Sequence, residues 1–306
     1  MAGLRQRNDE EVSVFQGGNT VPITINSNLA SLKGQRLLAT SSDALARTFE
    51  KLSSGQRINR ASDDAAGLAI ADSLKATQRV ASVAVRNAND GISTIAIADG
   101  ALGQIGNVLT RLAELAEQSA NGTYSTSQRS ALQNEFVSLA SEIERIAVTT
   151  TFNGVALLSG ASSISLQVGF NSASTAQIAI EGVTGTLAGL GLATANVSSL
   201  SYSITGATTE QAQSAARLAL DGVNGAIGSL AVQRGNLGAV ESRLSVSINN
   251  LSVARENFAA AESRIRDVDV ATESAELTRL NILQQAGASI LAQANQQPQL
   301  ALSLLR

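Results

Sequence analysis

The chain has 306 residues and a formal net charge of −3 at pH 7, and 44% of its residues are hydrophobic but only 3% aromatic. The net charge is small and the charged residues form no run of one sign, so nothing indicates binding to nucleic acid or to an anionic membrane. The mainly aliphatic composition favours narrow apolar seams between helices over one thick hydrophobic core. Because the chain contains neither Cys nor His, it cannot form disulfides or use the commonest general base and metal ligand.

The first elements that the sequence predicts are a disordered arm and a helix. Residues 1–20 are polar, of mixed charge and without a period, and they lack the apolar core of a secretory signal. A helix is expected from Asn28 to about Ile58, because an apolar seam repeats every seven residues. The seam comprises Leu38, Leu45 and Leu52, with Phe49 beside it.

Two inner helices should follow. Apolar residues at 3–4 spacing over residues 70–116 predict a helix about 70 Å long. Asn89-Asp90-Gly91 and Asp99-Gly100 are weak points, so we expect a break near residue 100. A further helix should begin after a cap at Ser125, Thr126 or Ser127 and run to about Val148. No apolar run approaches 18 residues, so no membrane-spanning helix is expected.

The period changes in the middle of the chain. SISLQVGF and AQIAIEGV alternate in twos around Asn171-Ser172, which predicts a β-hairpin. The Gly-, Ser- and Thr-rich segment after it has weak strand character. From Thr208 the helical period resumes and continues to about Ile265, with polar residues such as Arg234 inside the seam, which favours a specified register over maximal stability.

The last stretch, residues 269–306, has one narrow apolar seam that cannot bury itself. Its expected partner is the first helix, at the other end of the chain, and Gly287 would allow close helix approach. The self-assembly seam that we predict comprises Leu38, Leu45, Phe49, Leu52, Leu280, Leu283, Gly287, Ile290 and Leu291.

These elements predict a mainly α fold: a long antiparallel coiled-coil or helical-bundle rod with paired N- and C-terminal helices and a small central β-hairpin region. The expected domains are a disordered arm (1–20), a discontinuous axial coiled-coil core (21–60 with 268–306), a helical rod (61–150 with 207–267), and a hairpin with a variable outer loop (151–206). The two terminal helices have only narrow apolar stripes, so they should become ordered only between neighbouring copies. If the contacts between copies join two different surfaces of the molecule, they are heterologous and give an open helical filament.

Acidic pairs are the nearest approach to a catalytic motif. Asp63-Asp64 and Asp267 with Asp269 both lie at expected helix starts, where capping and the helix dipole favour acids. The motifs HExxH, GxxxxGK[ST] and GxSxG are absent. We therefore expect no enzyme activity, no cofactor and no metal site.

Several runs resemble bacterial flagellin: LSSGQRINRASDDAAGLAIA, TFNGVALLSG and SRIRDVDVATESAELTR. The resemblance covers about residues 21–170 and 207–306. It implies a structural subunit of the flagellar filament, exported unfolded by the flagellar type III apparatus and located outside the cell. The partners implied are further copies, the filament cap and hook-junction proteins, and an export chaperone on the C-terminal region. A hook–filament junction protein of the same fold is the alternative.

The resemblance also implies surface roles. Arg111, Glu114, Leu115 and Glu135 match positions by which the family meets a host Toll-like receptor; exposed helix charges and contacts between copies are the alternative reading. Flagellins often carry O-linked sugars, which makes the Ser/Thr-dense residues 161–205 a candidate for glycosylation.

Members of this family begin only a few residues before the motif that starts here at Ile23, whereas this chain carries about twenty more. We expect Val21 to be the initiator, which would give a mature start of Met-Pro-Ile-Thr-Ile-Asn. The intact mass of the filament protein checks this, and a mass that includes residues 1–20 would overturn it.

Overall fold

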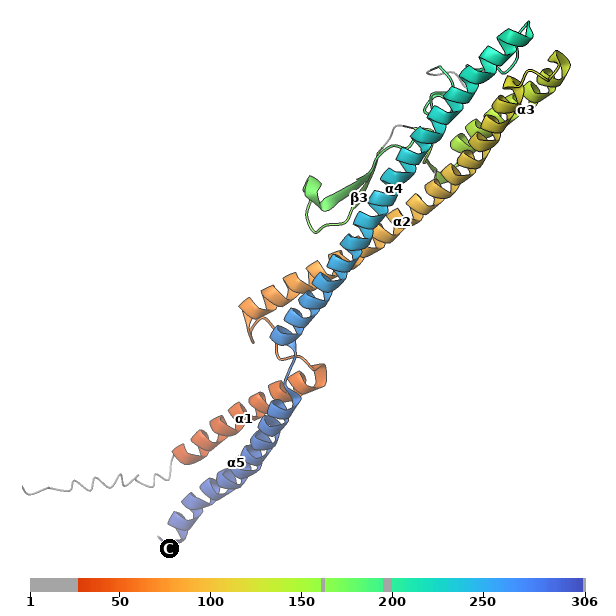
Figure 1. Cartoon of the computed structure of the whole chain (residues 1–306). Helices are drawn as coiled ribbons and strands as arrows, with labels where there is room; N and C mark the ends of the chain where they lie inside the picture. Colours follow the sequence, from red (N-terminus) through yellow and green to blue (C-terminus); the bar gives the residue numbers. More distant parts are fainter. Residues whose placement is uncertain (1–26, 161–162, 195–199, 305–306) are drawn as a thin grey trace, which may run out of the picture. The chain divides into compact units, whose positions relative to one another are not determined.

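The structure is a computed structural model and describes residues 27–160, 163–194 and 200–304. The expected arm at residues 1–20 and the proposed start at Val21 lie outside the described residues. Its elements are α1 (Leu29–Ser54), α2 (Ala65–Ala120), α3 (Thr126–Thr149), β1 (Thr151–Phe152), β2 (Val155–Ala156), β3 (Ile164–Gln167), the short 3₁₀ helix η1 (Ser174–Ala176), β4 (Gln177–Ile180), α4 (Thr209–Arg266) and α5 (Val270–Leu304) (Figure 1). The expected mainly α fold is confirmed.

The chain folds into two compact units. The terminal unit contains α1 and α5, with the described residues up to Ala65 and from Arg266 onward. The inner unit, Ala66–Ile265, contains α2, α3, the strands and almost all of α4.

Within the terminal unit, α1 ends in a tight turn that pairs with the start of the C-terminal segment. Gly55 caps α1 with a φ of 71°, a left-handed conformation that glycine adopts without a Cβ clash. The backbone N–H of Arg57 donates to the Arg266 carbonyl at 2.6 Å, and that of Val268 donates to Gly55 at 3.1 Å. These bonds fix the point where α1 and α5 come together.

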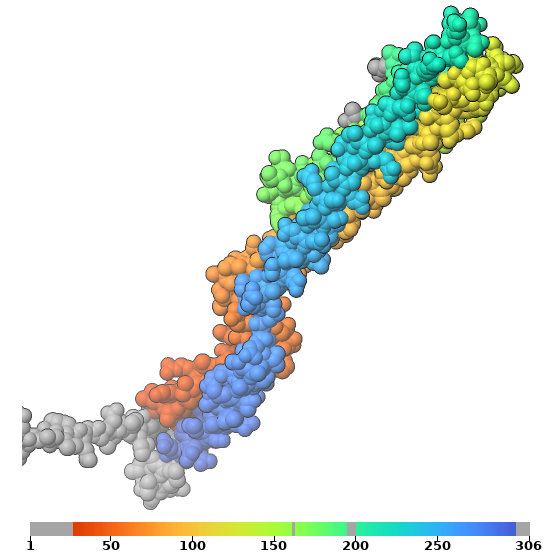
Figure 2. Space-filling model, in the orientation of Figure 1, coloured from red at the N-terminus to blue at the C-terminus, as the bar shows by residue number. Residues whose placement is uncertain are grey.

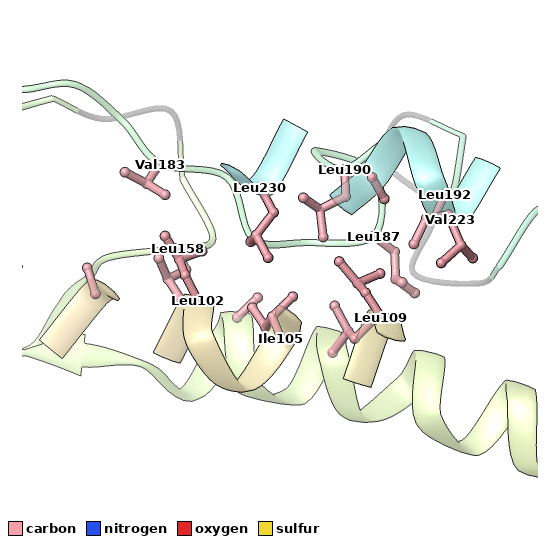
Figure 3. Packing of buried hydrophobic residues seen from close by; sticks show 14 of the residues in the cluster. Leu102, Ile105, Leu109, Leu158, Val183, Leu187, Leu190, Leu192, Val223 and Leu230 are labelled. Atoms are coloured by element: carbon pink, nitrogen blue, oxygen red, sulfur yellow. The ribbon is translucent and has the colours of Figure 1, made fainter. Parts of the chain in front are cut away.

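The inner unit is built on the pairing of α2 with α4. The largest side chains that α4 buries recur every seven positions: Val223, Leu230, Leu237, Leu244 and Leu251. Side chains of α2 such as Leu102, Ile105 and Leu109 meet them, and Leu187, Leu190 and Leu192 of the middle segment complete the cluster (Figure 3). A strict seven-residue repeat keeps one face of α4 on its partner throughout.

The expected hairpin is confirmed in β3 and β4, which pair antiparallel from Ile164↔Ile180 to Gln167↔Gln177. Its loop is longer than a tight turn, since η1 lies between the strands. A second, minimal hairpin, β1–β2, turns at Asn153-Gly154 with positive φ at both residues. This Asn-Gly signal of a type I′ turn was available in the sequence and was overlooked.

Polar side chains of the helices hold the backbone of the middle segment. The amide of Gln233 on α4 accepts from the N–H of Thr184 at 2.9 Å and donates to its carbonyl at 3.0 Å. Glu144 on α3 accepts from the N–H of Leu187 at 3.0 Å, and Gln133 on α3 accepts from Ile204 at 2.7 Å. These bonds satisfy main-chain hydrogen-bonding groups of a segment that has little regular secondary structure.

The expected break near residue 100 is wrong, because α2 runs unbroken from Ala65 to Ala120. Gly91 is buried where the hairpin comes close: a Cβ there would collide with Leu166 Cδ1 and lie 3.3 Å from Leu244 Cδ1. The carboxylate of Asp99 binds Arg234 of α4 through two contacts of 2.7 and 3.0 Å. Of the residues expected to break the helix, Gly91 therefore allows close packing of the hairpin, and Asp99 forms an ion pair with Arg234.

Among the described residues, one helix is long and apolar enough to cross a membrane by length and composition alone, contrary to the expectation from the sequence. It is α2, whose most apolar window has a mean hydropathy of 1.2. The core helix of a soluble protein passes the same test, so the observation is weak. Leu102 and Leu109, among its most apolar residues, are fully buried inside the inner unit.

The two glycines of α2 predict opposite effects of the same substitution. Gly91→Ala should lower the free energy of unfolding by about 1–3 kcal/mol, because the new methyl group overpacks against Leu166. Gly100→Ala meets nothing within 4 Å and should raise it by about 0.5–1 kcal/mol, since alanine is the better helix former. Urea denaturation followed by circular dichroism measures both, and equal effects would contradict the packing role of Gly91.

Candidate assembly surface

The terminal helices α1 and α5 pair antiparallel, as the order of their contacts shows. The side-chain amide of Asn28 donates to the carbonyl of Ala294 at 2.7 Å, at the start of α1. Further along, Gln284 donates to the hydroxyl of Ser42 at 3.3 Å. Near the end of α1, the Lys51 ammonium lies 3.7 Å from a carboxylate oxygen of Glu273.

Reciprocal glycine–leucine contacts set the distance between these helices. A Cβ on Gly34 would lie 3.3 Å from Leu291 Cδ1, and a Cβ on Gly287 would lie 3.5 Å from Leu38 Cδ1. Each helix thus places a leucine over a glycine of the other. The first distance is tighter than an ordinary side-chain contact, so Gly34 belongs to the close approach as much as Gly287 does.

The structure brings together only part of the predicted seam. Between α1 and α5 lie the buried or half-buried Leu38, Leu45, Leu52, Leu280, Gly287 and Leu291. Phe49, Leu283 and Ile290 point outward and are 65%, 43% and 63% exposed. The reason is periodicity: the inward positions of α5 are 280, 284, 287, 291 and 294, so 283 and 290 fall one residue outside the seam.

Polar members of the seam were missed in the sequence. Ser31 is 7% exposed, and its hydroxyl donates to the side-chain oxygen of Asn295 at 2.7 Å. Thr48 is 5% exposed. Ser31 lies seven residues before Leu38, so the heptad could have found it had polar residues been allowed in the pattern.

The terminal unit has almost no core of its own. Among its residues with described side chains, 27–65 and 266–297, the buried hydrophobic ones are Ile58, Leu280 and Ala294. Its surface carries large apolar side chains that are each at least 58% exposed. We call these seven the outer face: Leu29, Leu32, Leu37, Phe49, Val270, Ile282 and Ile290. A helix pair with so little buried apolar surface depends on further contacts for stability.

Asp269 caps α5, as the sequence predicted for this acid. Its carboxylate accepts from the backbone N–H of Ala271 at 3.0 Å and from the Thr272 hydroxyl at 2.8 Å. The hydroxyl and backbone donors of Thr272 hold the pKa of Asp269 below its ordinary value of 3.8. Asp63 has another role than a helix cap: it accepts from the backbone N–H groups of Asn59 and Arg60.

The charged residues singled out on the inner helices form one exposed cluster. Arg111 on α2 donates to Glu114 at 2.8 Å and to Glu135 on α3 at 2.9 Å. Leu115, however, is 0% exposed within the inner unit. Its expected part in a receptor contact is therefore corrected, because a side chain in the core offers no surface to a partner.

No cluster of three or more potential metal ligands occurs among the described residues.

Comparison with known proteins gives matches along most of the chain. The family model of the bacterial flagellin N-terminal helical region matches residues 25–163, and that of the C-terminal helical region matches residues 220–305. A flagellin of Halalkalibacterium halodurans is 43% identical over 92% of this chain and 99% of its own length. A flagellin of Bacillus subtilis is 41% identical, and the flagellar filament 33 kDa core protein of Treponema phagedenis 38% identical, over the same shares.

The cap of α5 predicts a pH dependence. Because folding lowers the pKa of Asp269, its stabilisation of α5 is complete above the ordinary pKa of 3.8 and is lost as the pH falls below it. Asp269→Asn keeps the acceptor but removes the titration, so the mutant should lose less helix than the parent chain between pH 4 and 2, as judged by circular dichroism of the polymerised chain at about pH 2–5.

Other carboxylates with lowered pKa values, such as Asp99 and Glu276, titrate in the same range in both proteins. Only the difference between the two acid curves reports on Asp269, and superimposable curves would show that its charge does not stabilise α5.

Proposed function

Because this chain belongs to the bacterial flagellin family and is a structural subunit that polymerises into the flagellar filament, we propose that its copies polymerise through the outer face of the terminal unit. The observation that carries this proposal is the imbalance of that unit. Seven large apolar side chains are at least 58% exposed, while its buried hydrophobic core is nearly absent. Neighbouring copies would bury the apolar side chains that a single chain leaves exposed to water.

The magnitudes are adequate for such an interface. Covering a largely exposed Leu, Ile, Val or Phe gains about 1–2 kcal/mol, so seven such residues supply on the order of 10 kcal/mol. That is of the same order as the loss of translational and rotational freedom on association, about 4–15 kcal/mol. Contacts with several neighbours would add to it, so polymerisation and the ordering of α1 and α5 become one process.

The domain roles follow from this. Residues 21–60 with 268–306 would form the axial core of the filament, and residues 61–150 with 207–267 a surrounding layer. Residues 151–206 would face outward. The relatives carry the names of filament proteins, and nothing among them favours the hook–filament junction alternative.

Further partners and the route outward belong to the same proposal. Export would use the flagellar type III apparatus, with a chaperone on the C-terminal region, and the filament cap and hook-junction proteins would be further partners. A host Toll-like receptor would meet the cluster of Arg111, Glu114 and Glu135, without Leu115. The role is structural, with no catalysis: the chain has no His or Cys.

A charge on the outer face should prevent polymerisation without unfolding the subunit. Ile290 is 63% exposed, so Ile290→Glu costs the isolated chain little. In the polymer it would bury an unpaired carboxylate, and we expect the critical concentration to rise at least about tenfold, which corresponds to about 1.4 kcal/mol. Sedimentation and electron microscopy of the purified chain after salt-induced polymerisation measure this.

The matched control is Ile290→Leu, which keeps volume and polarity and should polymerise as the parent chain does. Circular dichroism of the unpolymerised variants shows whether both are folded alike. Normal polymerisation of Ile290→Glu, or of a chain lacking residues 270–306, would overturn the proposal.

A further inference from the structure

The middle segment of the inner unit, part of which is visible in green at the surface in Figure 2, contains an asparagine that is placed for a spontaneous modification. Asparagine is one of the thermolabile residues. When glycine follows it, the glycine nitrogen can attack the side-chain amide carbon, because glycine has no Cβ to obstruct the approach. The chain has three such pairs, which share this chemistry and differ in their surroundings: Asn121-Gly122, Asn153-Gly154 and Asn224-Gly225.

The pair Asn224-Gly225 is protected by a helix. It lies in the interior of α4, which is unbroken from Thr209 to Arg266. Inside an α-helix each backbone N–H is bonded to the carbonyl four positions earlier. The nitrogen of Gly225 is therefore held in place, and the attack would require the helix to open.

The pair Asn121-Gly122 is held by hydrogen bonds on both sides of the asparagine. The side-chain oxygen of Asn121 accepts from the backbone N–H and from the hydroxyl of Thr123, both at 3.1 Å. Its main-chain carbonyl accepts from the buried guanidinium of Arg129 at 2.9 Å. The side chain of Asn121 cannot turn toward Gly122 without losing such bonds.

The pair Asn153-Gly154 has no comparable protection. It forms the turn between β1 and β2, where both residues are exposed and have positive φ, 50° and 78°. Among the described residues, neither the side-chain amide of Asn153 nor the backbone N–H of Gly154 has a hydrogen-bond partner. Both groups that the reaction joins are therefore free.

The strands on either side of this turn restrain it only weakly. They pair through Thr151↔Ala156 and Phe152↔Val155 alone. A two-stranded hairpin by itself is marginally stable in water, so the turn can open locally at little cost and bring the two groups together. We infer that Asn153 is a site of spontaneous deamidation in the folded chain and that it reacts ahead of Asn121 and Asn224.

The reaction requires water and no other reagent. The nitrogen of Gly154 gives its proton to the solvent and bonds to Cγ of Asn153, while the bond from Cγ to the side-chain nitrogen breaks and this nitrogen leaves as ammonia. Water then opens the resulting succinimide ring at either of its two carbonyls. The product is aspartate or isoaspartate at position 153, and each modified copy carries one more negative charge.

Isoaspartate would change the turn but not the helices. It leads the main chain through the side-chain carbon and so lengthens a loop whose type I′ geometry fits two residues. The pairing of Phe152 with Val155 should therefore be lost. Behind it, the N–H of Leu157 donates to the carbonyl of Thr150 at 3.1 Å, and Leu158 is fully buried in the core, so the disturbance should end there.

Peptide mapping by mass spectrometry tests the inference. The unpolymerised full-length chain is aged at mildly alkaline pH, sampled over time and digested with trypsin. Tandem fragmentation is needed to assign the modified residue, because the tryptic peptide 146–217 also contains Asn171 and Asn196. An isoaspartate-specific methyltransferase detects the isomerised product independently.

Conversion at Asn153 should be at least about tenfold faster than at Asn121 or Asn224, since the hydrogen bonds that hold those two pairs raise the barrier. In a sample unfolded in urea the three rates should converge, because the surroundings that distinguish the pairs are gone. Circular dichroism of the aged folded chain should show unchanged helix content.

The matched control is Asn153→Gly, which removes the amide and keeps a residue that adopts positive φ. On isoelectric focusing the parent chain should acquire an acidic band with age, whereas the variant should acquire severalfold less. Two results would overturn the inference: conversion of Asn121 or Asn224 as fast as that of Asn153 in the folded chain, or an unchanged Asn153 under conditions in which the urea-unfolded chain reacts.

Discussion

A pair of helices can cover only one side of each partner, and this limit governs the terminal unit. The reciprocal contacts of Gly34 with Leu291 and of Leu38 with Gly287 bring α1 and α5 close, but they use small side chains and bury little apolar surface. Phe49 and Ile290 are left outside. The same sequence feature that makes the pair close also leaves its outer side uncovered.

The inner unit is complete by comparison, because α4 and α2 share their long seam with α3 and the middle segment. The inner unit has a core of its own, whereas the terminal unit depends on further contacts for its stability.

Much of this fold could be read from periodicity. The helices, the hairpin and the cap at Asp269 follow from local patterns, since heptads, alternation and capping residues act within a few positions. Predictions from periodicity were wrong where contacts between distant parts of the chain determine the structure. Gly91 suggested a helix break, but in the structure it makes room for the side chain of Leu166. Ile290 was predicted to lie in the seam, but it is one position away from the inward-facing residue 291 and therefore lies outside it. Ser31 was missed because a polar residue at a seam position has no apolar signal.

The side chains that hold the middle segment have a consequence for its evolution. Gln233, Glu144 and Gln133 bind backbone groups of residues 184, 187 and 204, and Gln133 accepts in addition from the Ser203 hydroxyl at 3.4 Å. Main-chain amides are the same whatever the side chain, so the anchorage stays in the helices while the identity of many residues in the segment can change. Exposed residues of the segment can therefore be substituted without altering the helices that hold it.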